Sequence, residues 1–75
     1  MKTIDTLITM ANQIGAFFET MPDRQQALVD IAGHLKRFWE PRMRRALMDH
    51  IEQQDGAGLT EIVRIALRLH MTSLA

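Results

Sequence analysis

The side chains best suited to binding chemistry lie in one short segment, residues 36–45, with the sequence Lys-Arg-Phe-Trp-Glu-Pro-Arg-Met-Arg-Arg. We call this segment the basic turn. It holds five of the nine basic residues and one acid, Glu40, so a chain of zero net charge has a local charge of +4 there. Arginine pairs bidentately with carboxylates and phosphates, and Trp and Arg dominate many protein interfaces. The basic turn therefore predicts a contact with an acidic or phosphate-bearing partner, made by Arg37, Trp39, Arg42, Arg44 and Arg45.

Two other interpretations of the basic turn stay open from the sequence. A tight turn followed by a helix that starts with arginines resembles a helix-turn-helix nucleic-acid module. The neutral chain, with a pI of about 6.8, lacks the overall basicity of a stand-alone nucleic-acid binder, which makes nucleic acid the less favoured partner. The third interpretation is a solvated run of charge with Trp39 partly in the core. Cations at a helix N-terminus oppose the helix dipole, and this favours a partner over a solvated run.

No pattern of residues predicts catalysis, metal binding or cofactor binding by this chain. His34, His50 and His70 fall on three different expected helices, and there is no cysteine to complete a zinc site or to hold an iron-sulfur cluster. The loop at residues 55–58, Asp-Gly-Ala-Gly, lacks the preceding strand and the lysine of a phosphate-binding loop. We therefore expect a protein that is not itself an enzyme.

The expected location is cytoplasmic, with no contact with a membrane. Polar residues interrupt the N-terminal segment where a signal peptide would have an unbroken apolar stretch. No window approaches the ~20 apolar residues that span a bilayer.

Apolar residues recur at helical spacing along most of the chain, and they predict an all-α fold of three main helices plus a C-terminal helix. A chain of 75 residues is long enough for one domain, residues 1–75. The helices are expected at about residues 3–20, 22–38, 41–54 and 60–71.

Several local features of the first two helices carry specific expectations. Thr3 is a plausible N-cap of the first helix, and Gly15 in its interior predicts a closely packed neighbour. Only one of the adjacent residues Phe17 and Phe18 can face the core, which makes the other a candidate interface contact. The second helix is expected to have Pro22 in its first turn. It should bury Leu28, Ile31, Leu35 and Phe38.

The third helix is expected to begin at Pro41 and to end before a loop in which Gly56 or Gly58 takes a left-handed cap. It should bury Met43, Leu47 and Ile51. Thr60 should cap the last helix, which is apolar around most of its circumference. Such a helix is hard to bury in a small domain, so we expect another chain to cover part of it, although inward packing stays open.

The sequence resembles the delta subunit of NAD-dependent formate dehydrogenases. The resemblance covers nearly the whole chain and is most specific at Arg-Phe-Trp-acid-Pro-Arg-Met-Arg, residues 37–44, where this chain has Glu40 at the position usually held by aspartate. The other matching segments are residues 10–15, 17–18, 21–24, 31–36, 58–60 and 63–67.

The resemblance implies an accessory subunit of a cytoplasmic molybdenum or tungsten formate dehydrogenase that oxidises formate and reduces NAD. It also implies that other subunits carry the cofactors: bis-molybdopterin guanine dinucleotide and iron-sulfur clusters in the large alpha subunit, and FMN in the beta subunit. The implied role of this chain is to support assembly or stability of the complex by binding the alpha subunit. A maturation factor that leaves after cofactor insertion is an alternative.

Overall fold

The computed structural model describes residues 3–71, which form four α-helices and no strand. The helices are α1 (Ile4–Phe18), α2 (Arg24–Phe38), α3 (Pro41–Gln54) and α4 (Glu61–His70). The all-α prediction is confirmed. The remaining parts of the predicted domain, residues 1–2 and 72–75, lie outside the described residues.

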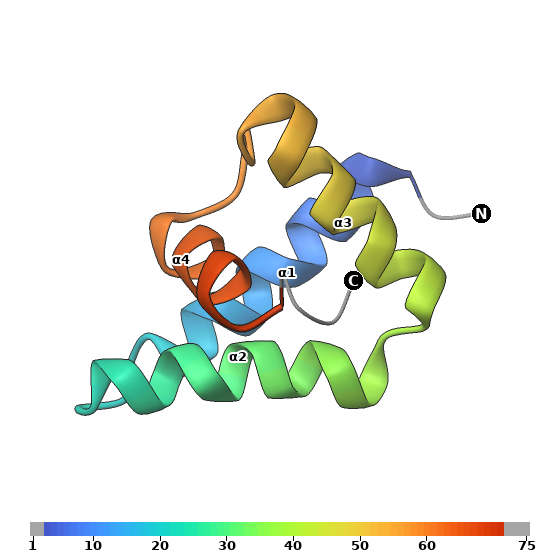
Figure 1. The fold of residues 1–75 in the computed structure, drawn as a ribbon. Coiled ribbons are helices and arrows are strands. Elements are labelled where there is room, and N and C mark those ends of the chain that lie inside the picture. The colour runs from blue at the N-terminus through green and yellow to red at the C-terminus, as the bar shows by residue number, and fades with distance from the viewer. Residues whose placement is uncertain (1–2, 72–75) are drawn as a thin grey trace.

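Helix α1 occupies the centre of the fold, where it contacts each of the other three helices. Helices α2 and α3 diverge from the turn that joins them, and α4 packs across α2 and α1 (Figure 1). The core lies between these helices. Its largest fully buried side chains are Ile31, Leu35, Leu47, Ile62, Val63 and Leu67.

Side-chain caps fix the starts of the first two helices. Thr3 Oγ1 accepts a hydrogen bond from Thr6 N at 3.3 Å, as predicted. Asp23 Oδ1 accepts from Gln26 N at 3.1 Å and makes Asp23 the N-cap of α2. The expectation that Pro22 lies in the first turn is therefore wrong: the capping carboxylate moves the helix start to Arg24 and leaves Pro22 before the cap.

The predicted close neighbour of Gly15 is Val63 in α4. A Cβ placed on Gly15 would overlap Val63 Cγ2, and the side chain of Val63 is itself fully buried. The absence of a side chain at Gly15 thus sets how closely α1 and α4 approach.

A loop at residues 55–59 reverses the chain between α3 and α4. The left-handed C-cap of α3 is Asp55, with φ of 57°, and not one of the glycines as expected, although Gly56 and Gly58 also have positive φ. An aspartate tolerates this conformation better than most residues with a side chain. Thr60 is the N-cap of α4 but makes no side-chain cap; its N–H donates to Asn12 Oδ1 at 3.0 Å.

Helix α4 packs inward, so the expectation that it is hard to bury without another chain is wrong. Ile62, Val63, Ala66 and Leu67 are all buried, because α1 and α2 both lie against this helix. Ile65 is only partly buried, and Leu69 has 63% of its surface exposed.

The structure exposes Phe38 and buries Trp39, in contrast to the sequence prediction. Phe38 was predicted to be buried but is 69% exposed, whereas Trp39 is 5% exposed and belongs to the core. Helix α2 ends at Phe38, and Trp39 has an extended backbone with φ of −90° and ψ of 139°. This change of backbone direction brings the larger indole into the core in place of the phenyl ring.

Candidate partner-binding surface

The basic turn is closed by one of its own arginines. Arg44 Nη1 donates to the carbonyl oxygen of Trp39 at 2.6 Å and to that of Lys36 at 3.1 Å. These acceptors belong to the C-terminal end of α2, where unpaired carbonyls and the helix dipole attract cations. Arg44, a predicted partner contact, thus joins the end of α2 to the first turn of α3.

The five residues predicted to bind a partner therefore fall into two groups. Arg37, Arg42 and Arg45 are exposed, and among the described residues none of them has a hydrogen bond or an ion pair. Trp39 is buried, and Arg44 is occupied within the chain. The helix-turn-helix interpretation relied on three arginines at the start of α3, and only Arg42 and Arg45 are free for such a role.

A row of four rings crosses the surface from the end of α1 to the end of α2. The ring centroids of Phe17 and Phe18 are 5.1 Å apart, those of Phe18 and His34 6.3 Å, and those of His34 and Phe38 4.8 Å. Phe17 and Phe38 are 71% and 69% exposed, whereas Phe18 packs partly against the core. The expectation that one of the two adjacent phenylalanines faces the core while the other stays on the surface is confirmed.

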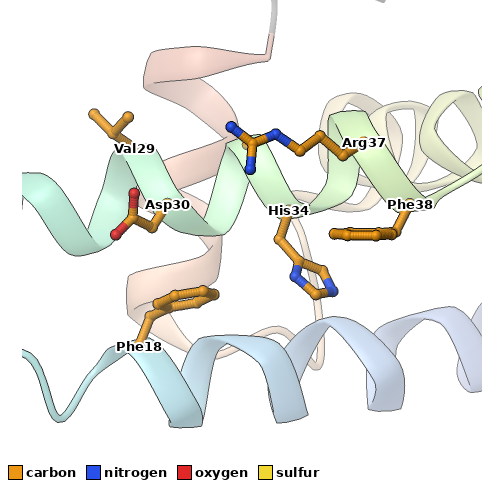
Figure 2. A pocket seen from close by; sticks show the side chains of 7 residues that line it. Phe18, Val29, Asp30, His34, Arg37 and Phe38 are labelled. Carbon is orange, nitrogen blue, oxygen red and sulfur yellow. The ribbon is translucent and has the colours of Figure 1, made fainter.

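Three of these rings line an open groove, which we call the aromatic groove. Its cavity volume is about 280 Å³, and its lining residues are Phe18, Val29, Asp30, Gly33, His34, Arg37 and Phe38. Figure 2 shows Asp30 and Phe18 toward one end and Phe38 at the other, with the guanidinium of Arg37 extending back over α2 between them. Asp30 accepts a hydrogen bond from Gln26 Nε2 at 2.9 Å. The aromatic groove thus combines apolar walls with one charge of each sign.

Gly33 leaves room in the aromatic groove that no part of the described chain uses. A Cβ placed on Gly33 would have no neighbour within 4 Å, in contrast to the Cβ on Gly15. Glycine in a helix interior costs about 1 kcal/mol relative to alanine. The packing of α2 within the described chain therefore provides no steric reason for this glycine.

The aromatic groove was not predicted from the sequence, although its signal is present in α2. Residues 30, 33, 34, 37 and 38 follow the three- and four-residue spacing of one helix face. Phe38 was assigned to the core by the same spacing. Without knowledge that α1 ends beside this face, nothing indicated that Phe18 would join it.

Residues 3–71 contain no group of three or more His, Asp or Glu side chains placed to hold a metal ion. None of the helices in this range is both long enough and apolar enough to cross a membrane.

The family model described as NADH-dependent formate dehydrogenase delta subunit FdsD matches residues 6–67 of the chain. Neither the curated proteins nor the solved structures include a match.

Proposed function

Because the chain belongs to the family of NADH-dependent formate dehydrogenase delta subunits, we propose that it serves as a non-catalytic accessory subunit of that enzyme. It binds the large, molybdopterin-carrying subunit and supports assembly or stability of a cytoplasmic complex. The delta subunit remains in the finished enzyme and does not leave after cofactor insertion.

The exposed aromatic surface is the observation that carries this proposal. Phe17 and Phe38 are both about 70% exposed, and Phe38 lines a groove with apolar walls. Exposed apolar patches in soluble proteins mark interaction sites, because a partner that covers them removes apolar area from water. The aromatic surface therefore supports a role in which another chain covers it.

The three exposed arginines of the basic turn give the proposed interface a positive charge. Arg37 lines the aromatic groove, and the chain continues from it to Arg42 and Arg45. Rim charges of this kind act mainly on the rate of association and on the choice of partner, whereas buried apolar contacts supply most of the affinity. An acidic region of the large subunit is the complementary surface.

The effect on the cofactors is indirect in this proposal. The holoenzyme that the family resemblance implies carries bis-molybdopterin guanine dinucleotide, iron-sulfur clusters and FMN in its other subunits. The delta chain has no cysteine, and its described part offers no metal-ligating cluster. Its contribution to cofactor retention is thus a stabilising contact with a cofactor-loaded subunit.

Co-expression with a tagged large subunit tests this function. The purified complex should contain the delta chain in equal amount to the large subunit through size-exclusion chromatography. A complex made without the delta chain should have a lower melting temperature or less bound molybdenum or tungsten. Absence of the delta chain from active, purified enzyme would contradict the proposal and favour the transient maturation factor.

A further inference from the structure

We propose that the aromatic groove receives one amphipathic helix of the large subunit. An apolar side chain of that helix enters the groove over Gly33, and an Asp or Glu of the same helix pairs with Arg37. This inference rests on the proposed function and specifies where and by what chemistry the contact is made.

Gly33 provides the steric part of the argument. The two helix-interior glycines, Gly15 and Gly33, each carry the usual helix-propensity cost. Gly15 is explained within the chain by Val63, but Gly33 has only open space above it. The close approach that Gly33 permits is therefore available to a second polypeptide.

The size and lining of the aromatic groove define the chemistry of the entering group. At the ~30 Å³ that a water occupies in the liquid, a cavity of about 280 Å³ holds several waters. Asp30, His34 and Arg37 can hydrogen-bond to water in the groove, whereas the side chains of Phe18, Val29 and Phe38 cannot. An apolar group that displaces water from these three apolar side chains gains affinity. A Leu, Met or Phe side chain matches this description.

Arg37 provides the polar part of the argument. Its guanidinium extends over α2 beside the groove (Figure 2), and it has no hydrogen bond or ion pair with residues 3–71. Asp30, the acid in the groove, is already engaged by Gln26. A guanidinium without a counterion at the edge of an apolar site pairs well with an incoming carboxylate.

The run of the groove along α2 favours a helix as the incoming segment. Its lining residues on α2 extend from Val29 to Phe38, which is more than two helical turns. Amphipathic helices dock in such grooves through apolar anchors three, four and seven residues apart. An acid one or two turns from the anchor then reaches Arg37.

A second copy of this chain is the main competing occupant. Antiparallel pairing of two α2 helices across Gly33 would set Asp30 of each copy against Arg37 of the other. That arrangement leaves the positive charge of Lys36, Arg42 and Arg45 without a comparable negative region, because the other half of α2 contains Arg24 and a single acid, Asp30. An acid-bearing partner helix balances the charge of this region better.

The variant Gly33→Leu provides the test, because a Cβ at position 33 has no neighbour within 4 Å and Gly33 lines the groove that the larger side chain would occupy. Purified delta chain, wild type or variant, is mixed with the tagged large subunit, and the bound amount is measured by pull-down and titration. Gln25→Leu, at an exposed position of α2 outside the groove, is the matched control. We expect Gly33→Leu to weaken binding at least tenfold and Gln25→Leu to change it less than twofold. The melting temperature of Gly33→Leu should not fall below that of the wild type.

Two variants of Arg37 test the same contact without a substitution at position 33, so their result does not depend on whether Gly33→Leu folds. Arg37→Glu should weaken binding at least fivefold, and Arg37→Lys less so, because lysine keeps the charge but loses the bidentate pairing. A photo-crosslinking side chain at Val29 should join a helical peptide of the large subunit that has an apolar residue within two turns of an Asp or Glu.

Distinct results would overturn the inference. Gly33→Leu and Arg37→Glu that both bind within twofold of wild type would show that the groove is not the contact, while the proposed function stands. Light scattering that shows a dimer of the free chain, disrupted by Gly33→Leu with binding to the large subunit unchanged, would assign the groove to a second copy. Wild-type chain that does not bind the large subunit would contradict both proposals.

Discussion

Arg44 donates a 2.6 Å hydrogen bond to the main-chain carbonyl of Trp39, and this contact holds the turn between α2 and α3. The indole of Trp39 lies in the core on the inner side of the same turn. The positive charge of Arg44 is unfavourable near the N-terminus of its own helix, α3. The contact places this charge at the C-terminal end of α2, where the helix dipole attracts cations. The basic turn therefore contributes to the stability of the fold through Arg44.

Replacing Arg44 by alanine should lower the stability of the isolated chain. Two charge-assisted hydrogen bonds at a half-exposed site are lost, and we expect a decrease of about 1–2 kcal/mol in the free energy of unfolding. Arg45→Ala, at an exposed neighbouring position, should change it by less than about 0.5 kcal/mol. Urea denaturation followed by circular dichroism measures both. Equal effects of the two variants would contradict the structural role of Arg44.

The adjacent residues Phe38 and Trp39 should respond in opposite ways to truncation. Trp39→Ala removes a buried indole and should cost about 3–5 kcal/mol, enough to unfold much of the population of a small domain. Phe38→Ala should leave stability nearly unchanged but reduce binding to the large subunit. Thermal melting and the pull-down measure the two effects. A large stability loss in Phe38→Ala would mean that its exposed ring is part of the core after all.

Gly15→Ala and Gly33→Ala should shift stability in opposite directions. At Gly15 the added methyl overlaps the stiff, buried side chain of Val63, and we expect a net loss of about 1–2 kcal/mol despite the better helix propensity. At Gly33 the methyl meets open space and should add up to about 1 kcal/mol. The melting temperature of Gly15→Ala should lie below that of the wild type, and the melting temperature of Gly33→Ala should lie above it. A stabilising Gly15→Ala would show that α1 and α4 can separate without cost.

Asn12 should anchor the loop before α4. Its Nδ2 donates to the carbonyl of Gly58 at 3.0 Å, and its Oδ1 accepts from the N–H of Thr60 at the same distance. Asn12→Ala should cost about 1–2 kcal/mol and accelerate hydrogen exchange at the Thr60 amide. Gln13→Ala, at the exposed next position, serves as the control. Unchanged exchange at Thr60 in Asn12→Ala would contradict this anchoring.

Reversing the two exposed arginines of α3 tests the electrostatic part of the proposed function. The double variant Arg42→Glu/Arg45→Glu leaves the Arg44 contacts intact and should bind the large subunit more weakly, mainly through slower association. The difference from wild type should shrink as salt rises from about 0.05 to 0.5 M, because salt screens exposed charges. Surface plasmon resonance at several salt concentrations measures this. Salt-independent binding that is equal for both proteins would remove the basic turn from the interface.

The sequence predicted the order and approximate bounds of the helices well where local chemistry decides them. The cap at Thr3, the start of α3 at Pro41 and the need for a neighbour at Gly15 all depend on residues within a turn or on a single missing side chain. Predictions at helix ends were weaker. The cap at Asp23 displaced Pro22 from the helix, and Asp55 took the left-handed position expected of a glycine.

The candidate site was predicted only in part. The sequence identified Arg37, Arg42 and Arg45 by charge, and they are exposed. It also named Trp39 and Arg44 as partner contacts, with Trp39 partly in the core as an alternative, and the structure places Trp39 in the core and Arg44 on main-chain carbonyls. Composition alone does not distinguish a solvated side chain from one with acceptors inside its own chain. The aromatic groove could not be predicted, because it forms only where α1 approaches α2. There Phe18 lies beside His34, which is 16 residues away in the sequence.

The sequence by itself determined that this chain is helical, that it lacks cysteine chemistry, and that it resembles a formate dehydrogenase delta subunit, since these follow from local spacing, composition and motif. Only the tertiary structure decided that α4 packs inward, that Trp39 and not Phe38 enters the core, and that Gly15 and Gly33 have different surroundings. The physical reason is that burial depends on which surfaces meet in space. Helical periodicity gives each residue a direction, but it does not specify whether another helix or solvent lies there.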